Sequence, residues 1–312
     1  MKYAFFQGCN IPIRIQQYAV ATTAVLKLFD VDLEVIDDFN CCGYPIRNVD
    51  EKSYILPSAR NLALAEQAGL DIMVICNCCF QSLKKAQQML ANDQALAAEL
   101  NEVLQKEGLH YTGKTRINHF LTILHEDIGL EAIKARLNHR YTTLNTAVIH
   151  GCHLLRPQKI TKFDDSFIPG ITDSLLQVAG AESIDWRGRL ECCGAALAGI
   201  NDELASRLFM EKIDNARAAD AEFIVPICAY CYLQFDTAQI NNLKAQPAKA
   251  NSRPFPVLLY PQLLGLCLGL QPAALGLADN QTISSAEIES LQARLGPPEP
   301  EKKRRKKAKA QV

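Results

Sequence analysis

Cysteines are the residues whose number and spacing in this chain point most directly to chemistry. Twelve occur among 312 residues, too few for a small disulfide-bonded scaffold and more than core packing requires. They lie at positions 9, 41, 42, 76, 78, 79, 152, 192, 193, 228, 231 and 267. Thiolates are soft ligands that bind zinc, copper(I) or iron–sulfur clusters, so the sequence predicts a metal or redox site.

Ten of the cysteines form one pattern that occurs twice. Each copy has a single cysteine, then an adjacent pair, then a Cys-x-x-Cys motif. The first copy consists of Cys9, Cys41, Cys42, Cys76 and Cys79, and the second of Cys152, Cys192, Cys193, Cys228 and Cys231. In both copies a glycine precedes the single cysteine and another follows the pair. The pattern indicates an internal duplication.

The elements between the cysteines must bring them together, and their patterning predicts an α/β fold. Four short apolar runs that lead to a cysteine are predicted strands: Tyr3–Phe6, Asp71–Ile75, Thr146–His150 and Glu222–Ile227. The predicted helices alternate with them: Ile15–Phe29, Ser58–Ala68, Ile171–Ala179 and Asp202–Ala219. Such alternation is typical of parallel sheets, whose carboxyl strand ends build the site. We expect two pseudo-symmetric halves, each a small parallel sheet with flanking helices and five cysteines at the strand ends.

Composition divides the chain into three parts. Residues 1–140 hold the first copy of the pattern and, from about residue 80, an insert predicted to be helical. Residues 141–296 hold the second copy, closed by a buried helix predicted at Val257–Leu270. Residues 297–312 begin with prolines and carry seven Lys or Arg. This last part is predicted to be a disordered basic tail, either simply solvated or docking an acidic partner.

The composition also argues against several classes of protein. A net charge of −1 gives no support for nucleic-acid binding. The apolar run at the N-terminus is too short for a signal peptide, and Val257–Leu270 is too short to span a membrane. No G-x-G-x-x-G follows the first predicted strand, so nothing indicates a bound dinucleotide. We expect a cytoplasmic protein without a transmembrane segment that exchanges electrons with partner subunits.

Five cysteines per copy exceed what an ordinary site needs. A structural zinc ion and a cubane iron–sulfur cluster each take four ligands. The side chains of adjacent residues such as Cys41 and Cys42 diverge, so they suit neighbouring irons of a polynuclear cluster better than one tetrahedral ion. Two alternatives stay open. One is an electron-relay subunit with no disulfide chemistry of its own, and the other is a zinc-stabilised scaffold or thiol–disulfide module.

The pattern resembles the cysteine-rich CCG domain, and the whole chain resembles the B subunit of heterodisulfide reductase. The resemblance runs from Met1 to about Gly276 and includes segments besides the cysteines: residues 2–6, 59–65, 151–157 and 263–266. It implies two non-cubane [4Fe-4S] clusters, one in each half, with all ten pattern cysteines as their ligands. It also implies an oxidoreductase that cleaves or forms a disulfide, with one sulfur captured at each cluster.

The resemblance further implies partners and a class of substrate. Electrons would pass through a ferredoxin-type subunit, similar to the C subunit of heterodisulfide reductase, and through a flavoprotein similar to its A subunit. The sequence Gly43-Tyr44-Pro45 is closer to bacterial relatives, which occur in sulfur-oxidising and sulfate-reducing complexes. The expected substrate is therefore a small disulfide or thiol, or a sulfur carrier.

Two cysteines lie outside the repeated pattern. Cys78 lies inside the first Cys-x-x-Cys motif, where the second copy has Tyr230. The register of the repeat predicts that Cys78 is not a cluster ligand. The alternative is that Cys78 replaces a neighbouring cysteine as a ligand. Cys267 lies between leucines and is predicted to pack in the core like a small hydrophobic residue.

A few polar residues lie close to the second copy of the pattern. His153 follows Cys152 and is the candidate catalytic residue, which could donate a hydrogen bond to sulfur or a proton to a thiolate. A structural role is the alternative, and His150 is predicted to be structural. Arg156 could steer an anionic substrate or compensate the charge of a cluster. The remaining histidines are predicted at the surface or at helix caps: His110, His119, His125 and His139.

Overall fold

The first half of the chain is built on a four-stranded parallel sheet. A computed structural model describes residues 1–245 and 253–298, so nearly all of the predicted basic tail lies outside the described residues. The strand order is β2-β1-β3-β4, and β1 pairs with β3 in parallel register, Tyr3 opposite Asp71. The strands are β1 (Lys2–Phe6), β2 (Asp32–Glu34), β3 (Asp71–Val74) and β4 (Ile117–His119).

The second half repeats this arrangement with three strands in the order β7-β6-β8. Its central pair is also parallel, with Thr146 opposite Phe223. The strands are β6 (Asn145–Ile149), β7 (Glu182–Ser183) and β8 (Phe223–Pro226), and a separate antiparallel pair joins β5 (Arg140–Tyr141) to β9 (Leu295–Gly296). The predicted α/β class with two parallel sheets is therefore confirmed.

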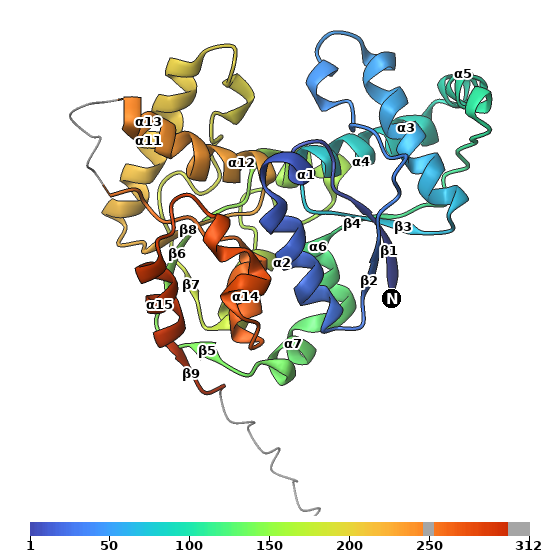
Figure 1. Cartoon of the computed structure of the whole chain (residues 1–312). Helices are drawn as coiled ribbons and strands as arrows, with labels where there is room; N and C mark the ends of the chain where they lie inside the picture. The colour runs from blue at the N-terminus through green and yellow to red at the C-terminus, as the bar shows by residue number, and fades with distance from the viewer. Residues whose placement is uncertain (246–252, 299–312) are drawn as a thin grey trace, which may run out of the picture.

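Helices flank both sheets (Figure 1). Those of the first half are α1 (Ile11–Arg14), α2 (Gln16–Lys27), α3 (Glu51–Gln67), α4 (Asn77–Asn92), α5 (Gln94–Leu104), α6 (Phe120–Thr122) and α7 (Leu130–Arg136). Those of the second half are α8 (Cys152–Leu155), α9 (Gln158–Thr161), α10 (Ile171–Ala179), α11 (Asp202–Ala218), α12 (Ala229–Leu233), α13 (Gln239–Ala245), α14 (Tyr260–Cys267) and α15 (Ser285–Ala293). Short 3₁₀ or π turns occupy 44–46, 105–107, 123–129, 195–197, 234–238, 272–275 and 277–279. No helix in the described part of the chain is long and apolar enough to cross a membrane.

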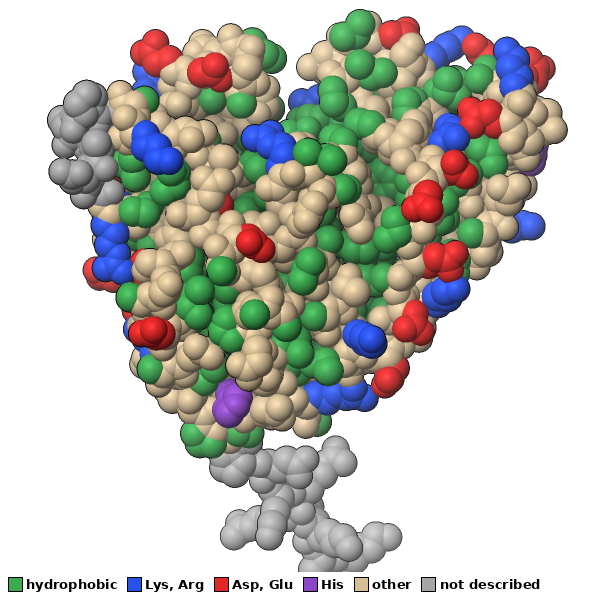
Figure 2. All heavy atoms as spheres, viewed as in Figure 1, with side chains coloured by type: hydrophobic (Ala, Val, Ile, Leu, Met, Phe, Trp, Pro, Cys, Tyr) green, Lys and Arg blue, Asp and Glu red, His purple; other side chains and the backbone are tan. Residues whose placement is uncertain are grey.

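The two halves share one continuous apolar core. Helix α2 of the first half packs against α14 of the second, and the two lie side by side at the front of the molecule (Figure 1). On the opposite side, α4 packs against α8 and α9. Between the two lobes that carry α3 and α11 the surface is hollowed (Figure 2), and α1, α4 and α12 lie at the base of this hollow (Figure 1).

Three expectations for secondary structure need correction. The insert from residue 80 is not wholly helical, because Ile117–His119 adds the fourth strand to the first sheet. Helix α3 begins at Glu51 rather than Ser58, since the Asp50 side chain caps it and Pro57 lies within it. The segment 257–270 forms a shorter helix than predicted. Its first residue, Val257, pairs in parallel with Ile224 beside β8, and the helix begins only at Tyr260.

Candidate metal centres

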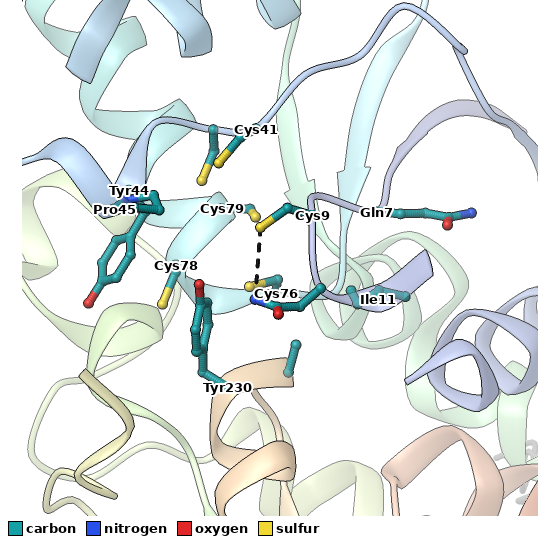
Figure 3. A pocket seen from close by; sticks show the side chains of 13 residues that line it. Gln7, Cys9, Ile11, Cys41, Tyr44, Pro45, Cys76, Cys78, Cys79 and Tyr230 are labelled. Atoms are coloured by element: carbon teal, nitrogen blue, oxygen red, sulfur yellow. Dashed lines mark hydrogen bonds between the residues drawn. The ribbon is translucent and has the colours of Figure 1, made fainter. Parts of the chain in front are cut away.

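The five cysteines of each copy line one pocket. The first pocket contains Cys9, Cys41, Cys42, Cys76 and Cys79, and the second contains Cys152, Cys192, Cys193, Cys228 and Cys231. Figure 3 shows sulfur atoms from separate loops converging on the first pocket. The structure thus groups the cysteines in the sets that the repeated spacing predicts. Cys78, Tyr44 and Tyr230 line both pockets, so the two sites are neighbours.

The strand ends position these cysteines. Cys9 and Cys152 lie just beyond β1 and β6, while Cys76 and Cys228 lie just beyond β3 and β8. Cys76 is also the N-cap residue of α4, and Cys79 lies one turn into that helix. Both sulfur atoms of this motif therefore come from the N-terminal end of one helix.

Glycine allows the loops to approach the Cys-x-x-Cys motifs closely. Gly8 has a positive φ of 68°, and a Cβ atom there would lie 2.8 Å from Cys79 Sγ. Gly151 has a φ of 77°, and its Cβ would lie 3.2 Å from Cys228 Cβ. A side chain at either position would therefore push apart the two segments that supply cysteines to the same pocket.

Each site has buried cysteines and an open side. Cys42 and the Cys-x-x-Cys residues are buried, as are their counterparts in the second half, whereas Cys9 and Cys192 are exposed. In the second site Cys193 Sγ lies 3.2 Å from Cys231 Sγ. Between the sites, the sulfur atoms of Cys76, Cys78 and Cys228 all lie within 4.8 Å of one another.

The electrostatics of the two sites match. Hydrogen bonds from Cys42 and Cys9 lower the pKa of Cys41 far below that of a free thiol, and hydrogen bonds from Cys152 and Cys193 do the same for Cys192. One cysteine in each site is therefore held as a thiolate by its neighbours. A group of five cysteine sulfur atoms, mostly buried, suits an iron–sulfur cluster well and offers more soft ligands than a tetrahedral zinc site uses.

Comparison with known proteins agrees with this donor set. The family model described as the cysteine-rich CCG domain matches twice, over residues 3–84 and 146–236. The chain is 32% identical over 283 residues to the B subunit of a CoB-CoM heterodisulfide reductase of Methanosarcina acetivorans, covering 89% of this chain and 93% of that protein. The chain belongs to the heterodisulfide reductase B-subunit family. Membership implies an iron–sulfur subunit of an oxidoreductase, and the double match confirms the predicted duplication.

Other relatives broaden the family. The chain is 30% identical over 280 residues to a protein of Wolinella succinogenes named as the membrane anchor subunit of an 8-methylmenaquinol:fumarate reductase, covering 89% of this chain and 96% of that protein. A crystal structure of a hypothetical protein from Helicobacter pylori has the same fold, with a TM-score of 0.68 at 15% identity. That match covers 91% of this chain and 52% of the other, so this chain spans about half the length of that protein.

His153 of this family member lines the second pocket. Its Nδ1 is 3.4 Å from Cys78 Sγ and 3.7 Å from Cys152 Sγ, while Nη1 of Arg47 is 2.7 Å from its Nε2. A guanidinium can only donate hydrogen bonds, so Nε2 accepts and Nδ1 carries the proton. Burial, followed by the charge of Arg47, lowers the pKa of His153. This geometry favours a hydrogen bond from His153 to sulfur over proton transfer.

Several residues around the sites were not singled out from the sequence. Arg47 and Tyr44 follow the first cysteine pair, and the guanidinium carbon of Arg47 lies 4.3 Å from the centre of the Tyr44 ring. Lys212 is buried in α11 close to the second site. A signal for Lys212 was present, because it falls on the apolar face of its helix with Phe209 and Ile213.

The other residues considered from the sequence lie outside the pockets. Cys267 is fully buried, and its thiol donates to the Ala179 carbonyl, so its predicted core role is confirmed. His150 is buried and accepts a hydrogen bond from Arg189 Nε at 3.2 Å, in line with a structural role. Arg156 donates to the carbonyl of Leu190 and lines neither pocket.

The four remaining histidines divide between surface and core. His110 and His139 are exposed, as predicted, and His125 is half-buried. His119 is fully buried in β4, so a surface position for it is wrong, but its Nδ1 does cap α6 by accepting from the Leu121 amide. The error arose because the insert was expected to contain no strand.

Proposed function

We propose that this chain is the iron–sulfur subunit of a heterodisulfide reductase-like complex and holds two [4Fe-4S] clusters of non-cubane type. The ten repeated cysteines are the ligands, five for each cluster. The observation that carries this proposal is the grouping of each complete set of five cysteines in one pocket. The family membership supports the iron–sulfur part of the assignment.

The proposed reaction is the cleavage or formation of a disulfide, either in a small thiol compound or on a sulfur carrier. Iron–sulfur clusters, when bound, supply electrons singly to such chemistry. The chain's own residues position the reacting sulfur atoms. The pockets share Cys78, Tyr44 and Tyr230, so the two sulfur atoms of one disulfide could each face a different site, as the predicted mechanism requires.

Partners and chain organisation complete the proposal. Electrons reach or leave the chain through a flavoprotein and a ferredoxin-type subunit, and the complex works in the cytoplasm. The chain divides into a first CCG domain at 1–140, a second at 141–296 and a basic tail at 297–312. His153 acts at the second site as a donor to sulfur, which its contacts with Cys78 and Arg47 support.

A second candidate is an electron relay without disulfide chemistry. The relative from Wolinella succinogenes favours it, because that protein is named for a fumarate reductase rather than a heterodisulfide reductase. In this role the same ten cysteines would hold the clusters, but no thiol or disulfide would bind near them. A zinc-stabilised scaffold is a third reading of the same donor set.

Metal analysis of anaerobically purified protein tests these candidates. Two four-iron clusters give about eight irons per chain and a similar amount of acid-labile sulfide. Zinc without sulfide would overturn the cluster assignment, and about four irons with one zinc would favour the relay. Addition of a disulfide to the reduced protein then separates the first two candidates. Oxidation of the protein with release of thiol supports disulfide chemistry, and unchanged spectra contradict it.

A further inference from the structure

The surroundings of the two cysteine sites differ in one buried charge. Lys212 lies on α11 in the second half with 2% of its surface exposed, and its Nζ donates to the backbone oxygen of Gly188. The equivalent residue in the first half is Asn61 on α3. The two helices align because their N-cap residues, Asp50 and Asn201, each lie seven positions after the glycine of a cysteine pair.

Asn61 uses its position differently. Its side chain accepts a hydrogen bond from the Asn40 amide at 2.9 Å and donates to the Asn40 carbonyl at 3.1 Å. Asn40 immediately precedes Cys41, so Asn61 fixes the loop that leads into the first site without adding a charge. Lys212 also holds a loop, the one that leads to Cys192, but it brings an ammonium group into the interior.

The charge of Lys212 acts on the sulfur atoms of the second site. In the part of the chain that the structure describes, no carboxylate oxygen lies within ion-pair distance of its Nζ. Burial lowers the pKa of Lys212, whereas Glu191, Cys231 and the cysteine pair act in the opposite direction. A buried ammonium group is costly unless negative charge lies nearby. The thiolates of the second site supply that charge.

We propose that Lys212 gives the second cysteine site a higher reduction potential than the first, so that electrons reaching the chain settle in the second half. The inference rests on the proposed function, because it concerns the two clusters. Reduction adds negative charge to a cluster, and a fixed cation in a poorly solvated interior stabilises the reduced form more than the oxidised form. Asn61, being neutral, gives the first site no such stabilisation.

A hydrogen bond to the single cysteine of the pattern is common to both sites. Arg47 of the first half binds His153 and so directs the Nδ1–H of that ring towards Cys78 Sγ, at 3.4 Å, and Cys152 Sγ, at 3.7 Å. A hydrogen bond to a ligand sulfur also raises the potential of a cluster. The first site has a matching donor, because the amide of Asn10, at the equivalent position, lies 3.8 Å from Cys9 Sγ. This contact therefore does not distinguish the two sites, and Lys212 is the charge that does.

An anaerobic potentiometric titration monitored by electron paramagnetic resonance tests this inference. The wild-type protein should show two midpoint potentials. In Lys212→Met, which removes the charge but keeps a long apolar side chain, the higher potential should fall while the lower stays unchanged. The matched control is Lys84→Met. Lys84 Nζ also lies 5.5 Å from an aromatic ring, but burial and Lys162 lower its pKa and, among the described residues, no cysteine acts on it, unlike Lys212. Neither midpoint should move in the control.

The assignment to the second half needs one more variant. Cys193→Ser alters the second site. The electron paramagnetic resonance signal that changes in this variant must therefore be the signal with the higher midpoint potential. An unchanged upper midpoint in both Lys212→Met and Lys212→Gln would overturn the inference, and so would loss of the lower-potential signal in Cys193→Ser. Iron and sulfide are measured on the same samples. If the Lys212 variants keep the full iron and sulfide content and their midpoint potentials do not move, only the role of Lys212 is refuted. If the wild-type protein contains no sulfide, the proposed function is refuted as well.

Discussion

The two halves of the molecule keep the same five cysteines but surround them with different chemistry. The first site has amide groups nearby, from Asn10 and Asn61, whereas the second has His153 and Lys212 at the equivalent positions. The glycines, the strand ends and the thiolate position are common to both. The duplication has therefore kept the cysteines and the loops that carry them, and has changed the polar and charged residues around them.

The halves also exchange side chains at their boundary. Cys78 belongs to the first Cys-x-x-Cys motif, yet it lies 3.4 Å from His153 of the second half. Its counterpart Tyr230 belongs to the second motif, yet it lines the first pocket together with Asn10. Each site is thus completed by a residue from the other half.

The largest expected effect comes from removing one proposed ligand. Cys42→Ser should lose or convert the first cluster only, and Cys193→Ser the second only, because each cysteine lines a single pocket. Iron content, sulfide content and resonance spectra of each variant give the readout. Cys267→Ser is the control, since that thiol is buried away from both sites. Retention of both native spectra in either ligand variant would contradict the assignment.

The equivalence of the two sites is next tested at their glycines. Gly8→Ala places a methyl group against Cys79 Sγ. Gly151→Ala places one 2.6 Å from Asn77 Nδ2 and 3.2 Å from Cys228 Cβ. Both changes force a positive φ on alanine. Strain of this kind costs roughly 1–3 kcal/mol, and we expect each variant to lose metal from its own site. Metal analysis measures the loss. Gly113→Ala, at a positive φ but with no neighbouring atom, separates backbone strain from crowding at the sulfur.

Much of this architecture was predictable from the sequence, because each central strand is a short apolar run that leads directly to a cysteine. The four strands that lead to cysteines are apolar and short, and each prediction matched an observed strand to within two residues at either end. The strands β2, β4, β5, β7 and β9 were missed, since two or three residues carry too little periodicity to be distinguished from a loop. The fold and the grouping of the cysteines follow local patterns, and both were found.

The residues that distinguish the two sites could not be found in the same way. Arg47 contacts His153 across more than a hundred residues of sequence, and no local pattern records such a contact. The helical pattern places Lys212 on the apolar face of α11, but a lysine is usually solvated, so the pattern alone did not predict that it is buried. Long-range contacts between the duplicated halves therefore required the structure.

Acid stability should depend on both halves, because each contains one buried neutral histidine. Burial lowers the pKa of His119 to about 3, and burial together with Arg189 lowers that of His150 to about 4. In the unfolded chain both take up a proton near pH 6.5. Each histidine therefore stabilises the fold above that pH, and its contribution is lost as the pH falls towards the folded pKa.

The slope of stability with pH measures this effect. Each histidine contributes up to about 1.4 kcal/mol per pH unit between pH 6.5 and its folded pKa. Thermal unfolding of the intact protein from pH 7 to 4.5 should show a falling midpoint, with a shallower slope in His119→Gln and in His150→Gln. His110→Gln, at an exposed position, should leave the slope as in wild type. If only one of the two variants makes the slope of the unfolding midpoint with pH shallower, the acid sensitivity comes from one half of the molecule alone.

The smallest effect distinguishes the caps of the equivalent helices α3 and α11. The Asn201 side chain accepts from the Leu204 amide at 3.0 Å, and the Asp50 side chain accepts from the Ser53 amide at 2.6 Å. Asn201→Ala should cost about 1 kcal/mol of unfolding free energy at every pH. The cap at Asp50 is a carboxylate whose pKa is lowered by the Ser53 amide, so its contribution is lost as acid protonates it. Asp50→Asn introduces the residue found at the equivalent cap of the second half, so the free energy that this cap contributes should no longer depend on pH. If the loss of unfolding free energy in Asn201→Ala did depend on pH, the two caps would not act locally.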